Sequence, residues 1–167
     1  MATSQRSDDE KVLLLVGAIV LVSQDAERYL KLSLPFFKSE DPSLGAALNR
    51  AKKLEKQTLG ALTGKFVEAS TSESLDFAQH MAYLVTSRNQ VVHHFNETYG
   101  AQIRSGAHQE VLSSLETLLT NLESYRAALE QVALAVVEGL RDITFRNTPE
   151  YSQIAELCTS IRSRVAS

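Results

Sequence analysis

The chain has 167 residues, a length typical of one compact domain that can bury a substantial hydrophobic core. Hydrophobic residues make up 44% of it and charged residues 22%, with 7 Gly and 3 Pro, which excludes collagen-like and disordered classes. The net charge of -3 gives no overall attraction to nucleic acid, so any such binding needs a local basic patch.

The first predicted element is a helix that follows a polar tail at residues 1–8, which we expect to be flexible. This helix opens with the apolar run VLLLVGAIVLV at residues 12–22. The run is shorter than the roughly 20 residues that a membrane span needs, and acidic residues precede it instead of the basic leader of a signal peptide. We therefore expect no membrane segment and a helix buried in a bundle or at a subunit interface.

A second helix is predicted from Asp41-Pro42, because Asp caps free amides and Pro suits the first helical position. Apolar residues with helical spacing continue to Phe66, and the opposite side carries Arg50 and a group of lysines. A basic face of this kind is usually only solvated. Near a functional site it becomes a candidate for RNA binding, through Lys52, Lys53 and Lys56.

The third helix is predicted to run from about residue 70, where Ser70 and Glu73 have capping-box spacing, to about residue 98. Gly100 and Gly106 then predict a loop. The fourth helix, at about residues 107–141, has apolar residues at alternating steps of three and four. This spacing predicts a seam that packs along another long helix.

A fifth helix is predicted after Thr148-Pro149, with apolar residues spaced to pack back on the others. It contains the only cysteine, Cys158, which excludes an internal disulfide and a cysteine metal cage and favours a cytoplasmic protein. No segment alternates like a strand. The sequence thus predicts an all-α fold, an up-and-down bundle of about five helices forming one domain over residues 9–167.

Arg88 interrupts the apolar stripe of the third helix. A buried guanidinium keeps its charge and needs a partner, so we expect either an internal ion pair, with Glu27 or Glu55, or an anionic ligand. Asn89 and His93 lie four residues apart on the flank beside Arg88. A fork of fixed donors, an amide and an imidazole suit phosphate chemistry without a metal.

The run Arg88-Asn89-Gln90-Val91-Val92-His93 fits the R-x4-H pattern of HEPN (higher eukaryotes and prokaryotes nucleotide-binding) domains, and the resemblance covers residues 12–99. It implies a HEPN-like bundle and a homodimeric, metal-independent endoribonuclease that needs no cofactor and cuts single-stranded RNA. Such proteins serve in toxin–antitoxin or phage-defence systems, with an antitoxin or another regulatory protein as partner. Arg88 would bind and stabilise the phosphate, His93 would act as general acid or base, and Asn89 would orient the histidine or a phosphate oxygen.

Two features limit what the resemblance implies. Family toxins regulated by a nucleotidyltransferase extend the motif to R-x4-H-x-Y, but this chain has Phe95 there. Other members bind RNA or act as scaffolds without catalysis, so a non-catalytic RNA-binding or protein-interaction module is the alternative function.

The remaining polar residues near the motif suggest no metal. His94 points about 100° away from His93 around a helix, so we expect it to contact RNA at the surface and not to share a metal with His93. His93 and Glu97 form half of a helical metal site, but no third ligand is suitably spaced. No metal is predicted.

Overall fold

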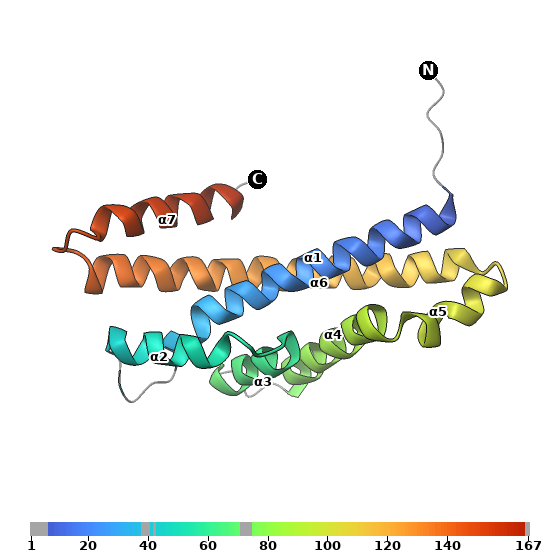
Figure 1. Cartoon of the computed structure of the whole chain (residues 1–167), viewed down its shortest axis with the longest axis horizontal. Helices are drawn as coiled ribbons and strands as arrows, with labels where there is room; N and C mark the ends of the chain where they lie inside the picture. The colour runs from blue at the N-terminus through green and yellow to red at the C-terminus, as the bar shows by residue number, and fades with distance from the viewer. Residues whose placement is uncertain (1–6, 38–40, 42, 71–74, 166–167) are drawn as a thin grey trace, which may run out of the picture. The chain divides into compact units, whose positions relative to one another are not determined.

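The computed structural model describes residues 7–37, 41, 43–70 and 75–165. It contains α1 (Asp8–Ser33), η1 (Leu34–Phe36, a 3-10 helix), α2 (Leu44–Leu54), α3 (Leu59–Ala69), α4 (Leu75–His93), α5 (Phe95–Arg104), α6 (His108–Gly139), η2 (Leu140–Thr144, a π-helix) and α7 (Tyr151–Val165) (Figure 1). No strand occurs within these described ranges. The predicted all-α helical class is confirmed.

A capping box fixes the start of α1. The Ser7 hydroxyl accepts a hydrogen bond from the Glu10 backbone N–H at 3.3 Å, and the Glu10 carboxylate accepts one from the Ser7 N–H at 3.0 Å. The helix therefore begins at Asp8, inside the predicted tail, while residues 1–6 of that tail lie outside the described part of the chain.

The predicted second helix is divided into α2 and α3. Ser43 caps α2, since its hydroxyl accepts from the Ala46 N–H at 3.3 Å, and Asp41 accepts from the Ser43 N–H at 2.9 Å. The predicted first-turn residue Pro42 lies outside the described residues. A break follows α2 because an unbroken helix would point Leu54 and Leu59 about 140° apart, whereas the turn lets both be buried.

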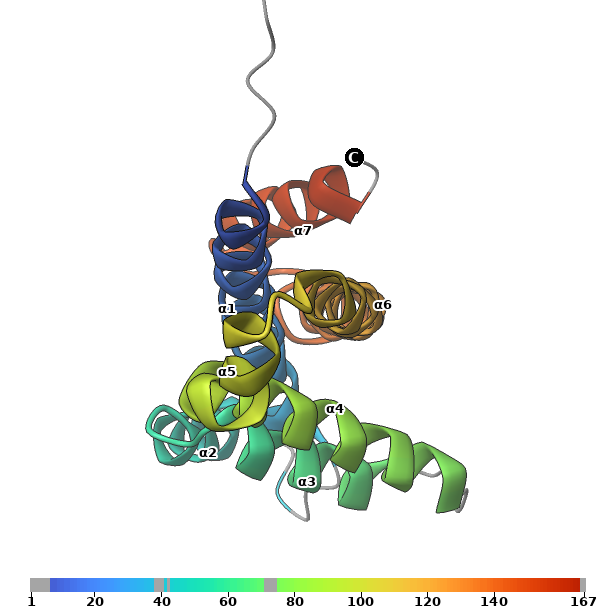
Figure 2. The same cartoon turned by 90° about the vertical axis from the view of Figure 1, so that its right-hand side faces the viewer.

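The predicted third helix is also divided, because His94 has φ -129° and ψ 26°. Figure 2 shows α4 and α5 running in different directions. Gly100 is buried within α5, so its assignment to a loop was wrong. The loop is formed at Gly106, whose φ of +81° suits glycine and whose N–H bonds the Ile103 carbonyl at 3.1 Å, closing the end of the helix.

Ser70 ends a helix and does not begin one. It is the C-cap of α3, with ψ 149°, and its hydroxyl donates to the Val67 carbonyl at 2.8 Å. Its predicted capping partner, Glu73, lies outside the described residues.

The chain separates into two compact units, and α1 and α6 each contribute one part to each unit. The first unit comprises Met1–Asp25 and Ser72–Ser124, and the second comprises Ala26–Thr71 and Tyr125–Ser167. The single domain expected over residues 9–167 stays a prediction. Five residues of the predicted seam of α6 are buried, Leu115, Leu118, Leu122, Tyr125 and Leu129, and its last two, Val132 and Val136, are half-buried.

In the second unit, α6 carries a buried carboxylate. Glu130 is 2% exposed, and its two oxygens accept hydrogen bonds from the Tyr29 hydroxyl and from Arg126 Nη1, the latter at 3.1 Å. The Tyr125 hydroxyl lies 3.2 Å from Thr63 Oγ1, and burial raises the pKa of Tyr125 to about 12. Polar pairs therefore fix the register of the helices within this unit.

The last helix packs along the end of α6. Figure 1 shows α7 running beside the second part of α6, and Cys158 is buried against Leu134 and Val137. Burial raises the pKa of the Cys158 thiol, so this side chain stays an uncharged apolar residue of the core.

Candidate functional site

Arg88 lies on the buried side of α4, in line with Met81, Leu84 and Val91, and its side chain is half-buried. Its Nε atom is buried and has no hydrogen-bond partner in the described structure. The far end of the guanidinium reaches the flank of the helix, where Nη1 donates to Asn89 Oδ1 at 3.0 Å. The charged end of Arg88 therefore lies at a polar surface, although the side chain begins on the core side of α4.

His93 joins this group at the last residue of α4. Its Nε2 lies 3.4 Å from Arg88 Nη1, and its side chain is exposed. A guanidinium can only donate, so this contact requires an unprotonated Nε2. The structure therefore brings together the three residues predicted as catalytic, Arg88, Asn89 and His93.

The carboxylates considered as partners of Arg88 have other environments. Glu27 pairs with Lys31 at 2.6 Å, and Glu55 is exposed in the turn after α2. Among the described residues of its own unit, Arg88 forms no ion pair with a carboxylate. The groups that we find around the guanidinium are an amide and an imidazole, so its attraction for an anion is not cancelled by a neighbouring negative charge.

The helix break changes the surroundings of the second histidine. His94 Nδ1 lies 2.9 Å from Glu97 Oε2, so Glu97 pairs with His94 and not with His93 as an unbroken helix would suggest. The two histidine rings are edge to face, with centroids 6.5 Å apart. His94 is exposed, and its contact with RNA stays a prediction.

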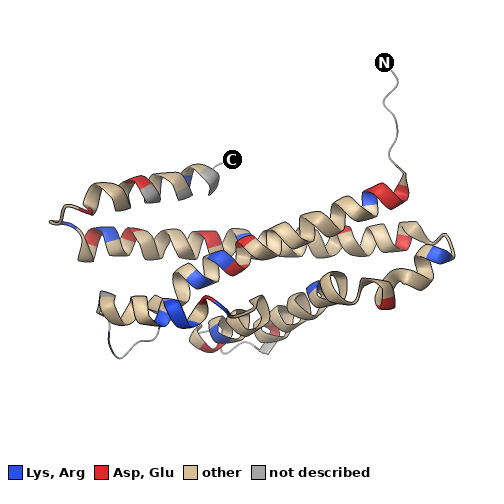
Figure 3. Cartoon of the chain, viewed as in Figure 1, with Lys and Arg blue, Asp and Glu red and all other residues tan. Residues whose placement is uncertain are grey.

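The predicted RNA-binding lysines belong to the second unit. Lys52 and Lys53 lie in the last turn of α2 and Lys56 in the turn that follows, all three exposed; Figure 3 shows basic residues in blue at this end of α2. Arg50 has a structural role, because its Nε donates to the Pro35 carbonyl at 2.7 Å. RNA binding by the three lysines stays a prediction.

A polar pocket in the first unit was missed by the sequence analysis. It has a volume of about 330 Å³, and hydroxyl groups from three helices line it, among them Tyr83, Ser87, Tyr99 and Thr117. Burial, and then the proximity of Tyr83, raise the pKa of Tyr99. The only sequence signal for this pocket was the group of hydroxyl residues on one side of α6. Their approach to the residues of α4 and α5 depends on the tertiary fold.

The described residues contain no group of three His, Cys, Asp or Glu side chains that could hold a metal ion. No helix in the same part of the chain is long and apolar enough to cross a membrane. Comparisons of the chain with models of protein families, with curated proteins and with solved structures find no match.

Proposed function

We propose that the chain is a metal-independent endoribonuclease of the HEPN type that cuts single-stranded RNA with Arg88, Asn89 and His93. One observation carries the proposal: Arg88 Nη1 lies 3.4 Å from His93 Nε2, and no carboxylate pairs with Arg88 in the described part of its unit. An anion-binding group and a proton-transfer group therefore share one exposed position at the end of α4.

The chemistry follows from these two groups. His93 removes the proton from a ribose 2′-hydroxyl, the 2′-oxygen attacks the adjacent phosphorus, and a cyclic phosphate forms as the bond to the 5′-oxygen breaks. Arg88 stabilises the negative charge that builds on the phosphate oxygens, while Asn89 holds the guanidinium through its 3.0 Å hydrogen bond. The leaving 5′-oxygen takes up a proton.

A second copy of the chain would supply a second histidine for that proton, so the proposal includes a homodimer. The α6 seam residues from Leu115 to Leu129 are already buried within the chain and are not free for such a contact. Helix α1 exposes Leu13 at 70%, Leu14 at 51% and Leu21 at 65%. We therefore favour this face of α1 for the dimer contact.

The proposed setting is the cytoplasm, in a toxin–antitoxin or phage-defence system. Phe95 stands where related toxins have the modified tyrosine, and its ring packs against Tyr99 with centroids 5.3 Å apart. An antitoxin or other regulatory protein would therefore act by a different route from tyrosine modification.

Cleavage of single-stranded RNA in excess chelator tests the proposal. We expect His93→Ala to lower the rate by at least about 100-fold, the usual contribution of a positioned proton-transfer group. Arg88→Ala should lower it by about 100- to 1,000-fold, the effect of removing a donor to the charge that develops in the transition state. His80→Ala is the matched control, because His80 is an exposed histidine on the same helix. Equal activity in all variants would refute the proposal, and binding without turnover would favour the non-catalytic RNA-binding alternative.

A further inference from the structure

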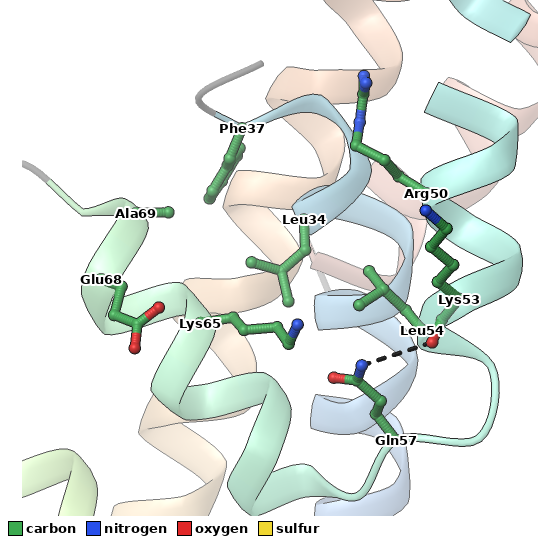
Figure 4. A pocket seen from close by; sticks show the side chains of 9 residues that line it. All are labelled: Leu34, Phe37, Arg50, Lys53, Leu54, Gln57, Lys65, Glu68 and Ala69. Atoms are coloured by element: carbon green, nitrogen blue, oxygen red, sulfur yellow. Dashed lines mark hydrogen bonds between the residues drawn. The ribbon is translucent and has the colours of Figure 1, made fainter. Parts of the chain in front are cut away.

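A second pocket, in the second unit, has the size of a small-molecule site. It lies between η1, the end of α2 and α3, and its volume of about 480 Å³ falls in the range of about 300–1,000 Å³ typical of ligand pockets. Leu34, Phe37 and Leu54 form an apolar wall (Figure 4), and the Phe37 ring packs on Phe66 with centroids 6.0 Å apart. The pocket can therefore accept an apolar body.

The lining of this pocket is positively charged. Arg50, Lys53 and Lys65 contribute three cations, and Glu68 is the one acidic side chain among the lining residues. Figure 4 shows the Lys65 side chain extending from α3 into the pocket. Within the described residues, neither Lys53 nor Lys65 forms an ion pair, so both ammonium groups are available to an anion.

Gln57 adds a specific polar requirement. Its Nε2 donates to the Lys53 carbonyl at 3.4 Å, which fixes the amide orientation, and its Oε1 is buried without a hydrogen-bond partner in the described structure. A buried acceptor of this kind is unfavourable unless a donor reaches it. The pocket thus offers an acceptor to a ligand N–H or O–H group.

We infer that this pocket binds a small organic anion that has an apolar body and one N–H or O–H donor. The anionic group lies between Lys53 and Lys65, the body packs on the apolar wall, and the donor bonds Gln57 Oε1. This inference goes beyond the proposed ribonuclease and does not depend on it, because none of the predicted catalytic residues lines the pocket.

Fluorescence titration of the full chain with 8-anilinonaphthalene-1-sulfonate tests the inference, because this probe combines an aromatic body, a sulfonate and an N–H group. We expect saturable binding at one site per chain. Lys53→Gln combined with Lys65→Gln should raise the Kd by about tenfold, the effect expected from losing two charge contacts. Lys52→Gln combined with Lys56→Gln is the matched control, because both lysines are exposed outside the pocket.

The neutral probe N-phenyl-1-naphthylamine separates the charge from the hydrogen bond. It lacks the sulfonate but keeps the N–H, so the Lys53 and Lys65 double variant should leave its Kd within about twofold of wild type. Gln57→Met should weaken binding of both probes by about threefold to tenfold, the effect expected from losing one hydrogen bond. Circular dichroism confirms that each variant is folded.

Several results would overturn the inference. Binding of the sulfonate without saturation, or at several equivalent sites, would show only adhesion to apolar surface. An equal loss of affinity in the Lys52 and Lys56 control would indicate general electrostatic attraction. Pocket variants that weaken RNA binding and leave both probes unchanged would assign the lysines to an RNA-binding surface instead.

Discussion

Replacing Arg88 by Met separates an anion-binding arginine from one held in an internal ion pair. Methionine keeps an unbranched apolar stem on the buried side of α4 and removes the guanidinium. The change removes a buried Nε that lacks a partner, which should raise the free energy of unfolding by about 1–3 kcal/mol. It also removes the hydrogen bond to Asn89, which should lower the free energy of unfolding by about 0.5–1.5 kcal/mol. We expect the free energy of unfolding to stay the same or rise by about 1 kcal/mol.

Thermal and urea denaturation measure this change. A gain of 1 kcal/mol corresponds to a rise in Tm of about 2–4 °C for a chain of this size. Arg126→Met is the matched comparison, because Arg126 does pair with the buried Glu130, at 3.1 Å, and its removal should cost about 2 kcal/mol after allowance for its partial exposure. A loss of about 3 kcal/mol or more in Arg88→Met would refute our account, since that is the cost of breaking a buried ion pair.

Three further stability predictions follow from the fold. Burial raises the pKa of Tyr125 to about 12, against about 10 in an unfolded chain. The protonated Tyr125 therefore contributes about 2–3 kcal/mol to the free energy of unfolding below pH 10, and this contribution is lost as pH rises toward 12. Tyr125→Phe should flatten the pH dependence of stability in that window, and an unchanged pH profile would contradict this. Glu130→Ala should lower the free energy of unfolding by about 3 kcal/mol in urea, because the buried Tyr29 hydroxyl and the partly buried Arg126 guanidinium both lose their acceptor. A change below about 1 kcal/mol would argue against the network. Gly64→Ala should stabilise α3 by up to about 1 kcal/mol, because position 64 is exposed and a Cβ there meets no other atom. Gly106→Ala should destabilise the chain by about as much, because Gly106 has positive φ and Gly64 does not. The same sign for both in calorimetry would refute this comparison.

The helical class could be predicted because apolar spacing and the few breakers depend on local sequence. The breaks at residues 55–58 and at His94 could not, because neither contains Gly or Pro. Each break lies between apolar residues that would face different directions on one straight helix, so both sets can be buried only if the helix is interrupted. Ser7 and Glu10, by contrast, carried a local capping signal that fixes the start of α1.

The candidate site, unlike the helix breaks, could be predicted from the sequence, because it depends on spacing within one helix and not on tertiary packing. Arg88, Asn89 and His93 lie on one helix, so their spacing alone brings them close, and the charge at Arg88 stands out against its apolar neighbours. The pocket containing Gln57 joins residues from η1, α2 and α3. Its assembly depends on the turn between α2 and α3, which periodicity does not reveal.

The most direct test of the central claim is RNA cleavage by Arg88→Met in excess chelator, measured beside wild type on a single-stranded RNA pool and on a 2′-O-methylated copy of it. We predict that wild type cuts only the unmodified RNA and leaves cyclic phosphate ends. Arg88→Met should be at least as stable as wild type and should have lost this activity. A stable Arg88→Met protein that cleaves as fast as wild type, or wild-type cleavage of the 2′-O-methylated RNA, would contradict the account.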